Sequence, residues 1–126
     1  MQLLTQAQRN RLLANGRQQA PLRGTSDEID FEPVVKLFNP WGGGTWLLTE
    51  LDPDDPDIAF GLCDLGVGTP ELGSVRISEL RDHAGPFGLN FARDLHWSPR
   101  GTLMDYARAA CDAGYVTEPR TGKGAR

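Results

Sequence analysis

The sequence predicts a single α+β domain in which a four- or five-stranded, mainly antiparallel sheet is flanked by short helices. Three observations lead to this fold class. The chain has 126 residues, which is enough to bury one modest core but too few for two. From residue 33 onward, short apolar runs are separated by Gly, Pro and Asp, as in an antiparallel meander. Helix-capping pairs occur near both ends of the chain.

The first capping pair predicts a helix over residues 6–15. Thr5 and Gln8 have the spacing of a capping box, in which each side chain accepts a hydrogen bond from the other residue's backbone N–H. Gly16 is expected to end this helix in left-handed geometry, because glycine has no Cβ to clash there. Residues 16–32 then form a polar connection that leads to the first strand.

Four apolar runs predict the strands of the sheet. Apolar residues alternate within them, which indicates that one face of the sheet packs on a common core. The segments Asn39–Gly44 and Pro53–Pro56 supply the first two turns, since Pro and Gly interrupt a ladder and favour turns. The predicted strands are Val34–Phe38, Thr45–Leu51, Ile58–Asp64 and Leu72–Ile77.

The segment after the fourth strand predicts two further short elements. Ser78 is expected to cap a helix from Glu79 to Ala84, which Gly85 and Pro86 would end. Asp94–Trp97 is expected to add a short strand. The sheet would then contain five strands.

The last helix has the clearest signals. Thr102 and Asp105 resemble a capping pair, the apolar residues that follow recur at helical spacing, and Gly114 marks the C′ position. We expect this helix to cover the sheet. The domain is predicted to span residues 1–116, and the basic tail Thr117–Arg126 is predicted to be disordered.

The composition indicates a soluble cytoplasmic protein. No apolar run approaches the roughly 20 residues that a membrane-spanning helix needs. The N-terminal residues lack the continuous apolar stretch of a secretory signal. Cys63 and Cys111 stand in unrelated settings without a CxxC pair, which is typical of reduced thiols. We therefore expect no membrane partner.

The charge of the chain is unevenly distributed. Residues 1–24 carry four arginines and no acidic residue, whereas residues 25–82 carry 13 acidic and three basic side chains, a net charge of −10. Residues 83–126 are weakly basic, and the whole chain has a formal net charge of −4. The field of the middle segment would repel a phosphate backbone and attract a basic partner. The alternative is that these acidic side chains are only solvated turn and edge residues.

Several ordered motifs resemble those of one family. Each fragment alone is a weak signal, but the ordered set is specific and spans about residues 3–110. The motifs are Pro33–Pro40, Thr45-Trp46 with Glu50 and Asp52, Phe60–Leu62 with Asp64, Pro70–Gly73, Ser78–Leu80, and Arg93-Asp94. This set resembles the family catalogued as domain of unknown function 2958. The resemblance implies an accessory protein of a bacterial plasmid or integrating element, without an established activity.

The leading functional hypothesis is a non-catalytic interaction module that binds a basic protein partner. It follows from the negative charge of the middle segment and from an aromatic residue, Trp41, beside the Gly42–Gly44 turn. Trp41 is either an exposed anchor for the partner or a lid on the core. The candidate binding residues are Trp41, Glu50, Asp52, Asp54, Asp55 and Asp57.

A metal-dependent hydrolase or nuclease is the second hypothesis. Carboxylates beside an imidazole can hold a divalent cation or share acid and base roles. The chain has neither an HExxH motif nor histidines at i and i+4, so we expect no metal and no cofactor. The acidic run from Asp52 to Asp57 lacks the glycine and the late glutamate of a calcium loop. The candidate cluster is Glu50, Asp64, Glu71 and His83, with Asp94 and His96 in the wider group.

Direct binding of nucleic acid is the third hypothesis. It would use the four N-terminal arginines together with the basic tail, and it would weaken steeply with salt. Few aromatic residues are interleaved with these arginines, so solvated side chains are the alternative. The arginines are Arg9, Arg11, Arg17 and Arg23.

Overall fold

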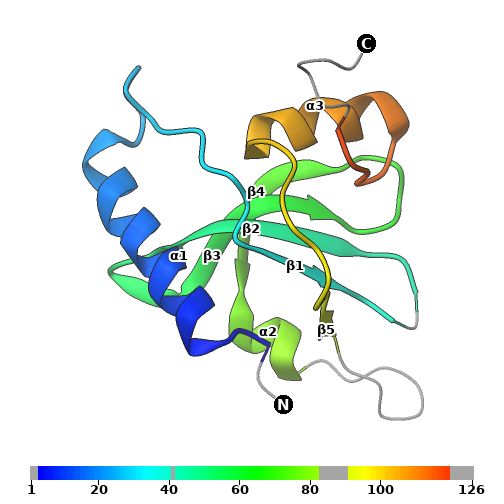
Figure 1. Ribbon diagram of the computed structural model, residues 1–126, viewed down its shortest axis with the longest axis horizontal. Coiled ribbons are helices and arrows are strands. Elements are labelled where there is room, and N and C mark those ends of the chain that lie inside the picture. The colour runs from blue at the N-terminus through cyan, green and yellow to red at the C-terminus, as the bar shows by residue number, and fades with distance from the viewer. Residues whose placement is uncertain (1–2, 41, 83–90, 120–126) are drawn as a thin grey trace.

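The computed structural model describes residues 3–40, 42–82 and 91–119. In this part of the chain, helices surround one five-stranded antiparallel sheet (Figure 1), which confirms the predicted single α+β domain. None of the helices in these three stretches is long and apolar enough to cross a membrane. The elements are α1 (Gln6–Gln19), the 3-10 helix η1 (Ala20–Leu22), β1 (Val35–Phe38), β2 (Thr45–Asp52), β3 (Asp55–Asp64), β4 (Glu71–Arg76), α2 (Ile77–Asp82), β5 (Ala92–Arg93) and α3 (Leu103–Ala113).

Helices pack on both faces of the sheet, so the prediction of one buried face is wrong. The strand order is β4-β3-β2-β1-β5. Trp46 and Leu48 of β2 belong to a core that includes residues of α1 and α2. Leu47, which points the other way between them, packs with Leu62 and with Tyr106 of α3. We call these two sides of the sheet the α1 face and the α3 face.

The fifth strand lies before the predicted segment. Ala92 and Arg93 form β5 and pair with Phe38 and Leu37 of β1. Asp94–Trp97 instead forms a turn, in which the Asp94 carboxylate accepts a hydrogen bond from the His96 backbone N–H at 3.1 Å. An aspartate that binds the backbone two residues ahead favours a turn over a continued strand, which explains the shift.

The helix after β4 begins at Ile77, which we predicted to end the strand. Ser78 does not act as the predicted cap. Instead, its backbone N–H and its hydroxyl donate to the two carboxylate oxygens of Asp57, at 2.9 and 2.6 Å. An acceptor on β3 thus satisfies an N–H of the first turn of α2. The predicted end of this helix, Ala84, lies outside the described residues.

The first helix continues through Gly16 and ends at Gln19, so the predicted end at Gly16 is wrong. The capping box of Thr5 and Gln8 is confirmed, with both hydrogen bonds at 3.0 Å. Gly16 has a different role. A Cβ at this position would lie 1.8 Å from the Leu51 carbonyl oxygen, so the missing side chain lets the backbone of α1 approach β2.

This close approach covers a free edge of β2. Strand β1 pairs with β2 only as far as Leu48, which leaves residues 49–52 without a partner strand on that side. The Asn15 side-chain amide donates to the Thr49 carbonyl oxygen at 2.9 Å and replaces one missing ladder bond. Helix α1 therefore protects the part of β2 that β1 is too short to reach.

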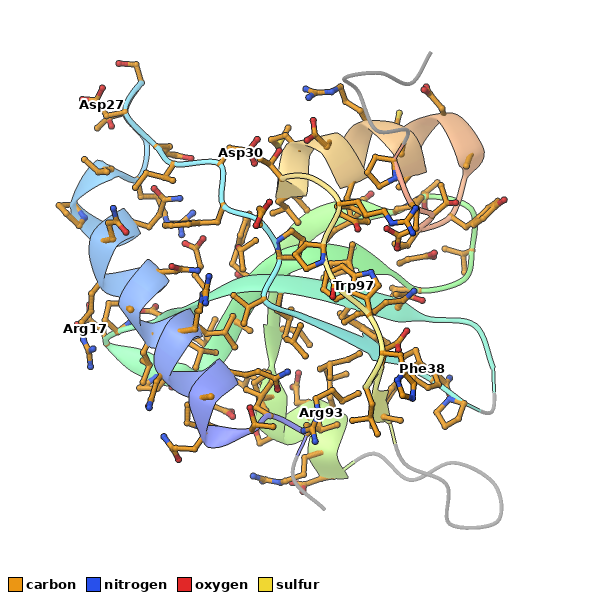
Figure 2. All side chains as sticks on the ribbon, viewed as in Figure 1. Arg17, Asp27, Asp30, Phe38, Arg93 and Trp97 are labelled. Carbon is orange, nitrogen blue, oxygen red and sulfur yellow. The ribbon has the colours of Figure 1, made fainter. Side chains whose placement is uncertain are left out.

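The connection between η1 and β1 holds the N-terminus of α3. The Phe31 carbonyl oxygen accepts a hydrogen bond from the Leu103 N–H at 2.8 Å. The Asp30 carboxylate, which lies beside the start of α3 in Figure 2, accepts one from the Met104 N–H at 3.0 Å. The first N–H groups of a helix have no partner within the helix, so this connection stabilises the start of α3.

The predicted ends of α3 are confirmed. Thr102 and Asp105 form a reciprocal capping box, with hydrogen bonds of 3.0 and 3.3 Å. Gly114 follows the helix in left-handed geometry, with φ of 85°, where a residue with a Cβ would be strained.

The packed structure continues beyond Val116, where we predicted a disordered tail to begin. The Glu118 carboxylate accepts hydrogen bonds from the Tyr106 hydroxyl at 2.5 Å and from the Trp97 indole N–H at 2.9 Å. Burial raises the pKa of Tyr106, which keeps its hydroxyl a donor to Glu118. Pro119 is buried as well. Residues 118 and 119 thus contact the domain, and the tail residues from 120 onward lie outside the described part.

Substitution of Gly16 by alanine should destabilise the fold. The new Cβ would meet backbone, and the resulting overpacking should outweigh the gain in helix propensity and cost about 1–3 kcal/mol. Urea unfolding followed by circular dichroism measures this change. Gly73→Ala on β4 is the control, because a Cβ there meets nothing within 4 Å. Equal stability of the two variants would contradict the close contact between α1 and β2.

The contact between Asp57 and Ser78 should make stability depend on pH. The Ser78 hydroxyl, with the nearby Arg76, lowers the pKa of Asp57. A lowered pKa in the folded state stabilises the fold above the unfolded-state value of about 3.9, and this contribution is lost as the pH falls through the folded-state pKa. Asp57→Asn should therefore reduce stability at neutral pH and have a shrinking effect below about pH 4. Thermal melts of the unmodified protein and of Asp57→Asn across this pH range measure the effect, and Asp112→Asn is the exposed control. If the difference in melting temperature between Asp57→Asn and the unmodified protein did not change with pH, the prediction would be refuted.

Candidate functional site

A groove lies on the α3 face of the sheet, between the C-terminal end of α1 and the start of α3. It consists of two adjoining clefts of about 430 and 260 Å³, and Arg23, Glu50 and Phe60 line both of them. We call it the Arg23 groove. The larger cleft is also lined by Asp52, Ile58 and Ser74, and the smaller one by Asp30, Leu72 and Met104.

A β-bulge turns Glu50 toward this groove. Leu48 pairs with Gly61 of β3, and Glu50 pairs with Phe60, so Thr49 is an extra residue in the ladder. Without this insertion, Glu50 would share the face of Trp46 and Leu48, because side chains alternate along a strand. The bulge therefore removes a carboxylate from the apolar core on the α1 face and places it beside Phe60 on the α3 face.

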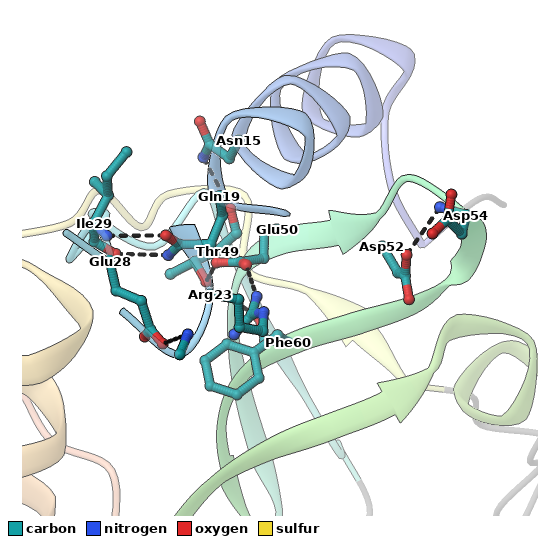
Figure 3. Close-up of polar contacts among 11 residues, drawn as sticks. Asn15, Gln19, Arg23, Glu28, Ile29, Thr49, Glu50, Asp52, Asp54 and Phe60 are labelled. Atoms are coloured by element: carbon teal, nitrogen blue, oxygen red, sulfur yellow. Dashed lines mark hydrogen bonds and ion pairs between the residues drawn. The ribbon is translucent and has the colours of Figure 1, made fainter. Parts of the chain in front are cut away.

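The Glu50 carboxylate is buried but has polar partners. The residue is 4% exposed. One oxygen forms an ion pair with the guanidinium of Arg23, and the other lies 3.1 Å from the Thr49 hydroxyl, which donates to it (Figure 3). A buried carboxylate requires such partners, because transfer of a charge out of water is costly.

The guanidinium of Arg23 also lies over an aromatic ring. Its Cζ atom is 5.2 Å from the centroid of Phe60, which is within the range of a cation–π contact. Figure 3 shows the side chain of Arg23 between Glu50 and Phe60. In contrast to Glu50, the Arg23 side chain is 48% exposed. The pair thus joins a buried anion to a cation that solvent reaches.

The backbone around Arg23 is positioned by the end of α1. The Gln19 side-chain amide forms two reciprocal hydrogen bonds with the backbone of Ile29, at 2.8 and 2.9 Å. These bonds close residues 20–28 into a loop, and Arg23 lies within it. Gly24 follows with φ of 83°, a conformation that favours glycine.

Acidic side chains outnumber basic ones around the groove. Among the described residues that line the two clefts, Arg23 is the one base, and four residues are acidic. A cation on an incoming partner would therefore meet an attractive field once it approached the groove. The acidic residues are Glu28, Asp30, Glu50 and Asp52.

The structure separates the candidate binding residues. Glu50 and Asp52 line the Arg23 groove, and the Asp52 carboxylate also accepts a hydrogen bond from the Asp54 N–H in the β2–β3 turn. Asp55 and Asp57 form ion pairs with Arg76 of β4, at 3.2 and 3.6 Å. Trp41 lies outside the described residues. Arg76 therefore partly neutralises Asp55 and Asp57, whereas the buried carboxylate of Glu50 lies in the groove.

The candidate metal cluster does not converge in the described part of the chain. Asp64 lies four residues beyond Phe60 on β3, and its carboxylate accepts hydrogen bonds from the Gly66 and Val116 N–H groups. Glu71 is exposed and pairs with Cys63, so its side chain lies on the opposite face from Asp64. His83 lies outside the described residues. No group of three or more His, Cys, Asp or Glu side chains suited to a metal was found among residues 3–40, 42–82 and 91–119.

The four N-terminal arginines also do not form one surface. Arg9, Arg11 and Arg17 lie on α1, and Arg17, which Figure 2 labels, is exposed to solvent. Arg23 instead turns inward to Glu50. Sequence reasoning missed the pairing of Arg23 with Glu50 and Phe60, because 27 positions separate the two charged residues and no local pattern joins them.

The ion pair of Arg23 and Glu50 should stabilise the fold. In a double-mutant cycle of Arg23→Ala and Glu50→Gln, we expect a coupling of about 1 kcal/mol or more, because Glu50 is buried. Urea unfolding of the four proteins measures it. The exposed pair of Arg81 and Asp82 is the control and should show a much weaker coupling. Equal coupling in the two cycles would show that burial of Glu50 has no energetic consequence.

Comparison with known protein families gives a match over almost the whole chain. The family model of DUF2958, a protein of unknown function, matches residues 3–117. No curated protein and no solved structure matches the chain. The matched range includes every strand of the sheet, the three α-helices and the Arg23 groove. The resemblance inferred from the ordered motifs is thereby confirmed, and the chain belongs to the DUF2958 family.

Proposed function

We propose that this protein is a non-catalytic interaction module whose Arg23 groove binds a basic segment of a partner protein. The main support is the buried carboxylate of Glu50, which lies in a surface groove beside the aromatic ring of Phe60. A buried carboxylate and an aromatic face together form a binding site for a cation.

The surroundings of Glu50 support this proposal. The acidic residues of the groove would steer a basic segment toward it, because clefts lined by one sign of charge attract the opposite charge. Ile58, Leu72 and Met104 add apolar surface, and Leu72 and Met104 are each about two-fifths exposed, at 41% and 38%. A partner that combines basic and apolar side chains would match both properties of the groove.

The family resemblance suggests the setting in which this module acts. We propose that it is a cytoplasmic accessory protein of a bacterial plasmid or integrating element. DNA-handling proteins, whether encoded by the host or by the element, carry basic surfaces that bind phosphates. A basic segment of such a factor is the class of partner that the acidic groove fits best.

Peptide binding tests the proposal directly. Fluorescence anisotropy would compare a labelled Gly/Ser peptide that carries several arginines with a counterpart that carries glutamates. We expect only the arginine peptide to bind, with an affinity that falls as salt is added. The double variant Glu50→Gln, Asp52→Asn should weaken binding by about tenfold or more, because it removes the buried carboxylate of the groove.

The matched control is Asp82→Asn, Asp112→Asn, which removes the same charge from two exposed positions on α2 and α3. It should change the affinity much less than the groove variant. Circular dichroism and thermal melts of both variants show whether each remains folded. Equal losses in two folded variants would mean that net charge alone attracts the peptide, and the assignment of the groove would then be wrong.

A further inference from the structure

Building on the function proposed above, we propose that the Arg23 groove contains an arginine-specific pocket and that Arg23 occupies it as an internal ligand. An arginine side chain of the partner would displace Arg23 and take its place between Glu50 and Phe60. The unbound protein would then be held in a self-inhibited state by its own residue.

The contacts around the guanidinium are those that recognise arginine. Glu50 supplies an anionic oxygen, and the Phe60 ring supplies an aromatic face at 5.2 Å. The Thr49 hydroxyl binds the second carboxylate oxygen and so orients the Glu50 carboxylate. A planar guanidinium can donate to a carboxylate while it stacks on a ring, which the rounder ammonium group of lysine does less well.

The position of Arg23 makes it replaceable. Its side chain is 48% exposed, and among the described residues Glu50 is the one hydrogen-bonding partner of its guanidinium. It lies in a loop whose next residues, 24–28, are all exposed. Withdrawal of Arg23 would therefore expose little apolar surface apart from the ring of Phe60. The clefts on either side of the guanidinium leave space for an incoming side chain.

Displacement has a thermodynamic consequence that can be measured. A pocket that its own residue fills most of the time binds an external ligand with an affinity reduced by the fraction of time that it is open. Removal of Arg23 should therefore increase the affinity for an arginine peptide. A purely structural ion pair would behave in the opposite way, because its loss would loosen the groove and weaken binding.

The decisive experiment uses Arg23→Ala in the full chain, with Arg17→Ala as its control. Both substitutions remove one positive charge, but Arg17 is an exposed residue of α1 that does not line the groove. We expect Arg23→Ala to bind the labelled arginine peptide about tenfold more tightly than Arg17→Ala does. The gain should be much smaller for a lysine peptide of the same length. It should disappear when Glu50→Gln is added to Arg23→Ala.

A second measurement distinguishes an emptied pocket from a loosened fold. Free N-acetyl-arginine amide should raise the melting temperature of Arg23→Ala more than that of the unmodified protein, because only the variant has an empty pocket. Arg23→Gln, which keeps a polar side chain at this position, should behave in the same way. No gain in affinity over Arg17→Ala, or an equal gain for lysine, would overturn the internal-ligand proposal.

The two proposals fail in different ways. If the unmodified protein binds the arginine peptide and the groove double variant does not, the proposed function stands. If Arg23→Ala then shows no gain in affinity, only the displacement of Arg23 is overturned. If the groove double variant binds the peptide as tightly as the unmodified protein does, the proposed function itself is wrong.

Discussion

Strand β1 pairs with only part of the longer strand β2, and this difference in length determines where α1 packs. Because β1 stops opposite Leu48, the last residues of β2 have a free backbone edge, and α1 covers it through Asn15 and Gly16. The position of α1 in turn fixes the chain that follows it. Gln19 closes the loop that carries Arg23, and Asp30 with its neighbours holds the start of α3. Through α1, the free edge of β2 therefore affects the position of both sides of the Arg23 groove.

The β-bulge in the same stretch of β2 determines the chemistry of the groove. It directs a carboxylate onto a face where a loop arginine and an aromatic ring are available, and away from the apolar core on the α1 face. A buried anion needs a positive partner, but it does not specify which one. The half-exposed Arg23 satisfies that need, and its side chain is of the kind that we propose as the ligand of the groove.

The acidic side chains of residues 25–82 thus have two different roles. Asp55 and Asp57 support the β2–β3 turn and the start of α2 through Arg76 and Ser78. Asp64 joins the end of β3 to the segment after α3. These carboxylates serve the fold, whereas Glu50 and Asp52 face the groove. Net charge along the sequence led to the prediction of a basic partner, but it did not distinguish the carboxylates that serve the fold from those that line the groove.

From the sequence we predicted the fold class, four of the five strands to within three residues, both capping boxes and the glycine that ends α3, because these features depend on contacts between residues close in sequence. It did not determine which face of β2 Glu50 occupies, since a bulge reverses the alternation on which such a prediction rests. Nor did it show the close packing of Gly16 on Leu51 or the meeting of Arg23, Glu50 and Phe60. These contacts join residues far apart in the chain, and only the tertiary structure brings them together.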